Sequence, residues 1–483
     1  MDRKNAAKIM FKLSFSSIVL SLTALTVCFT QTLPSYAENT TTSSKTPNQP
    51  LVVSNEQKQD IMYGRFYLKS QPLWEADFKA PVAWMSVNNR LLNVGSLFAK
   101  RTTSYDVISG LTIWNNYLSA PLVSPPLYVD NTLIATAKDC SIYGIDSVSG
   151  ENKYWILPFP YDRLVQESKK KRDDSMSDAS SRLTAAQAMA KAKEKAEERQ
   201  FRNQLLRLKF NSLPRLSYNS PCQGEEKIIC LSGDGIVTQF NSNGEKVEWS
   251  LLKCNGLSNK PFISSPAVEY FKSKSSEYLY AVSLNGQLWS INLNDPSSSS
   301  SQQIGSSDLN FRQPLRIIRN FLYLTASNGT MFCYALGADS EDNQYFQPKF
   351  VWRYRSSKTT YEQTNSQGYL INTPSFDLRK PRCFFANGND IVSLASLSGQ
   401  LLWRYESSQK LAGPTLYWNG NVLIATEAQT LLVLDAESGQ LKREYALPFI
   451  PSCPLVINDR YLYLGGDQGQ LTCFEIEDSA SDS

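Results

Sequence analysis

The chain of 483 residues contains no histidine. Histidine is the side chain that most often serves as a general base near neutral pH. Its absence excludes Ser-His-Asp and Cys-His nucleophilic sites, zinc or iron sites with imidazole ligands, and haem attached through histidine.

Other signatures of chemistry are missing as well. No Cys-x-x-Cys pair indicates a zinc or iron–sulfur site, no two cysteines are adjacent, and the chain has neither a Walker motif nor a dinucleotide fingerprint. We therefore predict no catalytic residues, no cofactor-binding residues and no metal ligands, and we expect that the protein is not an enzyme.

A repeated hairpin fills most of the chain. Its clearest copy is Val422–Leu441, with an apolar strand, a short turn, a second apolar strand, Asp435 and a tight turn closing at Gly439. A proline precedes the first strand of each copy, usually at intervals of about 40–48 residues, which is the length of one four-stranded propeller blade. Eight copies can be counted, at Pro81, Pro126, Pro221, Pro266, Pro314, Pro374, Pro414 and Pro454.

The second strand of each copy is apolar on both faces. Counted from the turn residue, the second and fifth positions are apolar in every copy, as in Leu431 and Leu434, and the fourth is mostly small, as in Gly144 and Ser393. Because side chains alternate along a strand, such a strand must be covered on both sides. The pattern predicts an all-β fold, an eight-bladed (seven is possible) β-propeller of four-stranded blades.

Glycine and tryptophan follow the second strand in several copies. The pairs are Gly110/Trp114, Gly150/Trp155, Gly244/Trp249 and Gly399/Trp403. Glycine suits a turn with positive φ, and the recurrence of tryptophan at one position favours packing between blades over a ligand site. Asp146 and Asp435 are predicted to cap their own turns, and Arg353 and Arg404 to pair with neighbouring strands.

The run "apolar strand, x-Gly turn, apolar strand, Asp-x-x-Ser-Gly-x-x-x-Trp" resembles the repeat of the PQQ-like (quinoprotein-like) β-propeller superfamily. The resemblance covers about Leu73 to Glu477, except for one insertion. The superfamily includes quinone-dependent dehydrogenases, some with calcium, and non-enzymatic scaffolds such as the BamB family of outer-membrane assembly factors. The resemblance therefore implies the fold and leaves the function open.

The N-terminal residues predict export. Lysines and arginines precede an apolar run from Leu13 to Phe29, and Ser35-Tyr36-Ala37 has the pattern of a cleavage site. We read 1–37 as a signal peptide and 38–57 as a disordered tether. Leu25 to Cys28 resembles a lipobox, but the bulky Val27 argues against a lipid anchor at Cys28.

The two ends of the repeat region are expected to join. Pro72–Phe78 looks like an outer blade strand without a blade, and the last copy lacks its outer strand. Pairing the two would close the ring and remove its edge strands. The propeller would span 58–477, followed by a disordered tail at 478–483.

One insertion, 162–209, interrupts the β pattern between the second and third repeats. Leu183–Leu208 lacks glycine and proline and favours a helix. Two interpretations stay open: the helix docks its apolar end on the propeller, or it protrudes as an arm that binds a partner. In the second case the candidate contact residues are Arg199, Phe201, Arg202, Leu205 and Leu208.

Eight cysteines lie beyond the predicted signal peptide: Cys140, Cys222, Cys230, Cys254, Cys333, Cys383, Cys453 and Cys473. An even number in an oxidising compartment suggests disulfides. Cys333 and Cys473, however, occupy the same small position of their repeats, where buried free thiols are common. We expect mostly free cysteines, with Cys222 and Cys254 as the first candidate pair.

Three functions agree with these features. The first is an exported, monomeric, non-catalytic scaffold in the periplasm or cell envelope, peripheral to the membrane at most, that binds envelope or outer-membrane assembly proteins. The others are a PQQ-dependent dehydrogenase and an envelope polysaccharide binder. Nucleic acid is not an expected partner, because the formal net charge is only +4 and the insertion, at roughly +5, accounts for it.

Overall fold

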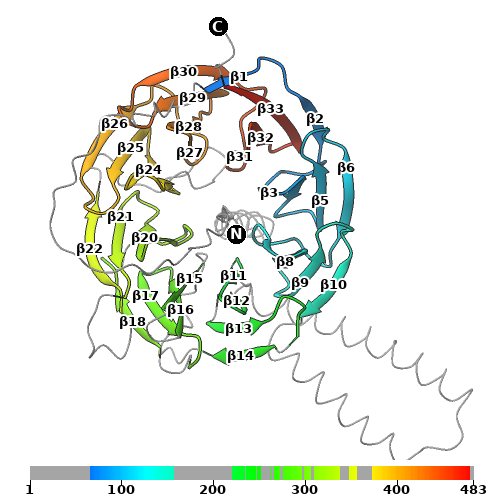
Figure 1. Cartoon of the computed structure of the whole chain (residues 1–483), viewed down its shortest axis with the longest axis vertical. Helices are drawn as coiled ribbons and strands as arrows, with labels where there is room; N and C mark the ends of the chain where they lie inside the picture. The colour runs from blue at the N-terminus through cyan, green and yellow to red at the C-terminus, as the bar shows by residue number, and fades with distance from the viewer. Residues whose placement is uncertain are drawn as a thin grey trace, which may run out of the picture.

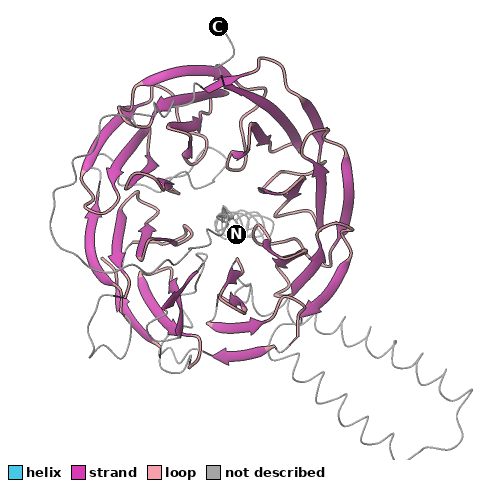
Figure 2. Cartoon of the chain, in the orientation of Figure 1, coloured by secondary structure: helices cyan, strands magenta, loops and turns pink. Residues whose placement is uncertain are grey.

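The computed structural model describes residues 66–156, 220–233, 235–245, 247–251, 262, 266–271, 276–295, 299–305, 309–337, 347–355 and 373–478. These residues form thirty-three strands in eight sheets, and no helix occurs among them. The sheets stand around one axis as the blades of a propeller (Figure 1) and are joined by loops and turns (Figure 2). The prediction of an all-β, eight-bladed propeller is confirmed.

Each of the first seven blades contains four consecutive antiparallel strands, the first nearest the axis and the fourth on the rim (Figure 1). The first blade is β3 (Trp84–Asn88), β4 (Leu91–Gly95), β5 (Arg101–Asp106) and β6 (Thr112–Tyr117). The second is β7 (Leu127–Val129), β8 (Thr132–Thr136), β9 (Ile142–Asp146) and β10 (Asn152–Ile156). The third is β11 (Cys222–Gln223), β12 (Ile228–Leu231), β13 (Ile236–Phe240) and β14 (Glu248–Leu251).

The fourth to seventh blades repeat this order. The fourth is β15 (Ala267–Phe271), β16 (Ser276–Val282), β17 (Gln287–Asn292) and β18 (Ser300–Gln303). The fifth is β19 (Arg316–Ile318), β20 (Phe321–Thr325), β21 (Met331–Ala335) and β22 (Lys349–Tyr354). The sixth is β23 (Ser375–Asp377), β24 (Arg382–Asn387), β25 (Asp390–Ala395) and β26 (Leu401–Glu406), and the seventh is β27 (Leu416–Trp418), β28 (Asn421–Ala425), β29 (Thr430–Asp435) and β30 (Leu441–Ala446).

The eighth blade joins the two ends of the described chain. It contains β31 (Val456–Asn458), β32 (Tyr461–Gly465) and β33 (Gln470–Asp478), and β33 pairs on its outer side with β1 (Phe66–Leu68) and β2 (Trp74–Asp77). In the register Trp74 lies opposite Cys473 and Phe66 lies opposite Asp478. The predicted closure is confirmed for β2, and β1 is an additional strand that the sequence pattern did not reveal.

The core is distributed between blades. The second and fifth positions of every repeat are buried, as in Leu431 and Leu434, which have no exposed surface. Eight hydrophobic clusters result, each between two consecutive blades, and the cluster around Leu92 and Tyr463 joins the eighth blade to the first. Both faces of every middle strand are therefore covered, as the apolar pattern predicted.

The predicted signal peptide (1–37), tether (38–57) and helical insertion (162–209) lie outside the described residues. Among the described residues, none belongs to a helix long and apolar enough to span a bilayer.

Candidate functional site

Four tryptophans on outer strands hold neighbouring blades together. The indole Nε1 groups of Trp74 and Trp114 each donate to a carbonyl of the following blade, on Val107 and Ser147, at 3.0 Å. Trp352 and Trp403 do the same at 2.9 Å, to Ser396 and Ala436. The turn glycine of the following blade has no room for a side chain, because an added Cβ would lie only 2.5–2.6 Å from the indole ring. This holds for Gly110, Gly150, Gly399 and Gly439. The repeated tryptophans therefore pack between blades, as predicted, and do not form a ligand site.

The assignment of Trp155 to this position was wrong. Tyr154 packs against Gly244 of the third blade, whereas Trp155 is 38% exposed. Tyr154 follows Gly150 by four residues, as Trp114 follows Gly110. In the seventh blade Arg443 stands four residues after the turn glycine, where the first, second and sixth blades have an aromatic residue. Its guanidinium lies 3.8 Å from the centre of the Tyr67 side-chain ring, in the segment that closes the propeller.

The small fourth position of the repeat has a cause within the blade. Ser393 pairs with Trp403, Cys333 with Trp352, and Gly144 with Tyr154 across adjacent strands. A side chain added at Gly144 would lie 2.2 Å from the Tyr154 ring. The small residue therefore makes room for the aromatic ring of its own sheet.

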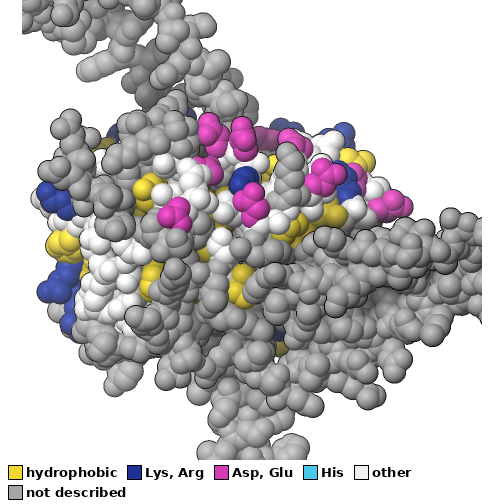
Figure 3. Space-filling view, turned by 90° about the horizontal axis from the view of Figure 1, so that it is seen from below, with side chains coloured by type: hydrophobic (Ala, Val, Ile, Leu, Met, Phe, Trp, Pro, Cys, Tyr) yellow, Lys and Arg dark blue, Asp and Glu magenta, His cyan; other side chains and the backbone are white. Residues whose placement is uncertain are grey.

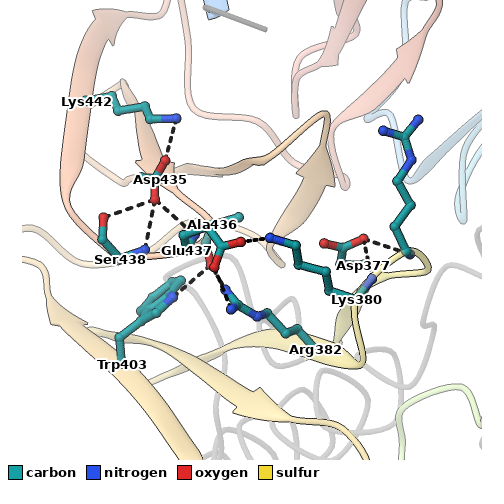
Figure 4. Close-up of polar contacts among 10 residues, drawn as sticks. Asp377, Lys380, Arg382, Trp403, Asp435, Ala436, Glu437, Ser438 and Lys442 are labelled. Carbon is teal, nitrogen blue, oxygen red and sulfur yellow. Dashed lines mark hydrogen bonds and ion pairs between the residues drawn. The ribbon is translucent and has the colours of Figure 1, made fainter. Parts of the chain in front are cut away.

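The aspartates that recur in the turns are structural as well. Asp435 Oδ1 accepts the backbone N–H groups of Glu437 and Ser438 at 3.0 and 2.8 Å, and its Oδ2 lies 2.7 Å from Lys442 Nζ (Figure 4). Asp146 repeats the arrangement, and the hydrogen bond from the Ser149 backbone, followed by Lys153, lowers its pKa to about 2. The prediction that both residues cap their turns is confirmed.

Charged side chains reinforce the same junctions. Lys380 and Arg382 of the sixth blade both bind Glu437 of the seventh, and Arg382 Nη2 lies 2.5 Å from its Oε2 (Figure 4). Arg404 pairs with Asp390 on the neighbouring strand at 2.6 Å, as predicted. Arg353 was predicted to pair too, but it is exposed and makes no ion pair within the described part of the chain.

The described residues include no group of three or more Cys, Asp or Glu side chains placed to hold a metal ion. Five cysteines are free buried thiols: Cys230, Cys333, Cys383, Cys453 and Cys473. Burial raises the pKa of the Cys333, Cys453 and Cys473 thiols to about 12, so they are poor nucleophiles. Cys254 lies outside the described residues, as do the predicted contact residues Arg199, Phe201, Arg202, Leu205 and Leu208.

Exposed apolar side chains gather on the rim in two places. One group, called here the first arc, follows β2, β6 and β10 on the right of Figure 1 and comprises Leu73, Ile108, Leu111, Ile113, Tyr117, Val148 and Trp155. Leu111 is 68% exposed and Tyr117 is 73% exposed. The ring of Trp74 packs on Gly110 and that of Trp114 on Gly150, so the members from three blades lie side by side.

The second arc follows β22, β26 and β30 from the left to the top of Figure 1 and comprises Phe350, Val351, Leu397, Leu401, Leu402 and Leu441. Trp352 packs on Gly399, which brings Leu397 and Leu401 next to β22. The two arcs differ in charge, because Lys349, Arg353 and Arg355 flank the second.

A β-bulge in the outer strand presents one member of the first arc and two of the second. Ser104 pairs with Trp114 and Tyr105 with Thr112, so Ile113 has no partner and points outwards. Val351 and Leu402 are skipped in the same way. In two other blades the skipped residue is Lys153 or Lys442, which binds the turn aspartate instead. An apolar residue immediately before the docked aromatic residue is thus the sequence signal that could have revealed the arcs.

Acidic side chains gather on one part of the face seen in Figure 3. Figure 3 shows them along the upper side of the view, which faces the third and fourth blades. Glu225, Glu226, Glu245, Glu248 and Glu277 belong to these blades. Lysine and arginine side chains lie with apolar ones at the left edge of Figure 3, the side on which Figure 1 places β22.

Residues 387–481 match the family model described as outer membrane protein assembly factor BamB. No curated protein sequence matches the chain. Among solved structures, BamB from Moraxella catarrhalis is similar, with a TM-score of 0.54 and 9% identity over 85% of this chain and 100% of that one.

Two further structures show that the similarity belongs to the fold. Saccharomyces cerevisiae Sqt1 has a TM-score of 0.56 and 8% identity, covering 85% of this chain and 100% of its own. Quinohemoprotein alcohol dehydrogenase from Comamonas testosteroni has a TM-score of 0.53 and 10% identity, covering 84% of this chain and 76% of its own.

Proposed function

We propose that this chain, a PQQ-like repeat propeller similar to BamB in its last repeats and in its eight-bladed ring, is an exported, non-catalytic scaffold that binds proteins of outer-membrane assembly. The observation that carries the proposal is the first arc, a large exposed apolar surface on a ring whose repeated aromatic residues are otherwise used between blades. The similarity supplies the class of partner.

The first arc has the composition of a protein-binding surface. Protein interfaces are rich in aromatic side chains and poor in charged ones at their centre. Leu111, Ile113 and Tyr117 lie on or next to one outer strand, and the nearby cations Arg90 and Lys153 are already paired with Asp106 and Asp146. Exposed apolar side chains whose neighbouring cations already have acidic partners favour a protein partner over a polysaccharide or a nucleic acid.

A pull-down of outer-membrane assembly proteins from envelope extracts tests the proposal. Leu111→Ser with Tyr117→Ser should reduce recovery at least tenfold, since central apolar contacts each contribute about 1–2 kcal/mol to such interfaces. The matched control is Ser301→Ala with Gln303→Ala on the polar outer strand β18, which should leave recovery unchanged. Equal recovery with both variants would refute the role of the first arc.

The predicted insertion arm needs its own variant. A chain without 162–209 should lose partners only if that segment binds them, so equal recovery would assign binding to the ring alone.

Fractionation of cells that express the tagged chain tests export, and a cytoplasmic location would contradict the proposal.

The dehydrogenase alternative is decided separately. The protein should show no dye reduction with alcohols or sugars after incubation with PQQ and calcium. Quinone-dependent turnover would overturn the non-catalytic assignment.

A further inference from the structure

We propose that the second arc, together with Lys349, Arg353 and Arg355, docks the propeller on a membrane surface that carries anionic headgroups. The proposal concerns the opposite side of Figure 1 from the first arc, and it does not depend on the identity of any protein partner.

The apolar part of this surface spans two blade junctions. Phe350 is 52% exposed and Leu397 is 47% exposed, and Leu401, Leu402 and Leu441 continue the surface into the sixth and seventh blades. The indole of Trp352, buried on Gly399, fixes the fifth blade against the sixth, so these side chains are held in place by a packed junction. Preorganised apolar side chains on a rigid edge can enter the headgroup region without an ordering cost in the backbone.

Three cations on or next to β22 have no acidic partner among the described residues. Lys349, Arg353 and Arg355 are all exposed, and none makes an ion pair with any described residue. The cations of the next two blades differ, since Arg382 binds Glu437, Arg404 binds Asp390, and Lys442 binds Asp435. The edge strand β22 therefore brings together exposed apolar side chains and three cations that pair with no described residue.

An anionic bilayer surface matches both features. Long cationic side chains reach the headgroups while neighbouring apolar side chains enter the acyl boundary. Lys349 and Arg353 bracket Phe350 and Val351 in sequence, which interleaves the two kinds of contact. Two exposed carboxylates, Glu406 and Glu444, lie on β26 and β30, and the three cations at β22 outnumber them.

Co-sedimentation of the purified full chain with phosphatidylcholine vesicles, with and without phosphatidylglycerol, tests this inference. We expect binding that requires phosphatidylglycerol and weakens as salt is added. Lys349→Gln with Arg353→Gln and Arg355→Gln should weaken it about a hundredfold, at roughly fivefold per cation. Phe350→Ser with Leu402→Ser should weaken it as well.

Matched controls remove the same charge and the same apolar character elsewhere. Arg90→Gln with Lys227→Gln and Lys410→Gln changes three exposed cations that already have acidic partners, and Leu111→Ser with Ile113→Ser changes the first arc. Both should bind vesicles as the unmodified chain does. Because all variants keep the apolar run Leu13–Phe29, their differences report the propeller surface alone.

Several outcomes would overturn the inference. One is vesicle binding that is equal with and without phosphatidylglycerol, and another is vesicle binding that is equally strong for the charge variant and its control. A third is retention on immobilised polyglutamate without vesicle binding, which would make the partner an acidic protein segment. Absence of vesicle binding would leave the pull-down prediction for the first arc intact, and a failed pull-down would leave the vesicle prediction intact.

Discussion

At the scale of single residues, one carboxylate organises the turn between the third and fourth strands of a blade. In the second blade the N–H groups of Val148 and Ser149 donate to Asp146 Oδ1 at 2.9 and 2.8 Å, and Lys153 Nζ lies 3.0 Å from Oδ2. These contacts favour the ionised form and lower the pKa of Asp146 from 3.8 to about 2. The stabilisation is present above about pH 4 and is lost as the pH falls through 2.

Asp146→Ala should therefore lower the free energy of unfolding by about 1 kcal/mol at pH 7, a modest value because the site is partly exposed to solvent. Urea unfolding at pH 7 and near pH 2 should show the difference shrinking at the lower pH. Glu151→Ala, at an exposed neighbour, is the control and should have no effect at either pH. A difference independent of pH would show that the charge does not stabilise the turn.

A second residue departs from its repeat. Asn93 is fully buried on β4, at the position held in other blades by Tyr323, Phe384 or Tyr463. Neither its side-chain oxygen nor its nitrogen has a hydrogen-bond partner among the described residues, and the same holds for the Ser104 hydroxyl opposite it. A buried amide without partners is destabilising.

Asn93→Leu should therefore raise the free energy of unfolding by about 1 kcal/mol, because an apolar side chain of similar size removes the unpaired groups. Thermal unfolding measures the change. Leu423→Asn makes the reverse change at the equivalent, fully buried position of the seventh blade and should cost about 2–4 kcal/mol. Destabilisation by Asn93→Leu would show that the amide is needed.

At the scale of elements, the docked tryptophan and the turn glycine form one unit across each junction. Gly439 has a φ of +73°, and an added side chain would meet the Trp403 ring at 2.5 Å. The indole also donates to Ala436 in the same turn. The turn is therefore specified both by its own backbone and by the ring from the preceding blade.

Gly439→Ala should cost about 2–4 kcal/mol, since it combines an unfavourable φ with displacement of a packed ring. Amide exchange should accelerate first in β26 and β29, which meet at this junction. Gly413→Ala is the control, because that position has an ordinary φ and open space around it, and it should change stability by less than about 0.5 kcal/mol. Equal effects at the two glycines would contradict the proposed unit.

The sequence was sufficient for features that depend on periodicity. Blade number and double-sided burial follow from repeated positions such as Leu431 and Leu434, and ring closure follows from Pro72–Phe78 lacking a partner in its own blade. The choice of Trp155 over Tyr154 failed because the position was assigned by residue type. Tyr154 stands four residues after the turn glycine Gly150, as Trp114 stands four residues after Gly110, and the same bulge precedes both rings.

The arcs were missed for a related reason. Phe350, Leu401 and Leu402 have the composition of buried strand residues, and only their place on the fourth strand leaves them exposed. Unpaired cations such as Arg353 could not be recognised either, because pairing depends on contacts between strands. Exposure on the rim is a property of the assembled ring.

At the scale of the whole molecule, closure determines whether the ring is one cooperative body. The eight inter-blade clusters form an unbroken circuit, and the one between the eighth and first blades includes Trp74 and Phe78 from the segment that precedes the first blade. Phe78 has no exposed surface. With the circuit closed, the two arcs are held on different sides of one rigid ring (Figure 1), an arrangement suited to a scaffold that contacts a membrane and a protein at once.

Removal of residues 1–79 should open the circuit. It deletes β1 and β2, exposes the outer edge of β33 and leaves the apolar surface around Tyr463 and Cys473 uncovered. Loss of the three buried aromatic side chains of Phe66, Trp74 and Phe78 should alone cost about 4 kcal/mol or more. An uncovered strand edge also invites pairing between molecules.

Size-exclusion chromatography should therefore show association of this shortened chain, and amide exchange should be fastest in Gln470–Asp478. Deletion of residues 1–57, which keeps β1 and β2, is the control and should give the stability and exchange of the full chain. Trp74→Ala is the milder variant, expected to cost about 3–5 kcal/mol without association because the backbone pairs with β33 remain. A monomeric 1–79 deletion with unchanged thermal stability would show that β33 needs no outer partner and that the ring is held together by the other seven junctions alone.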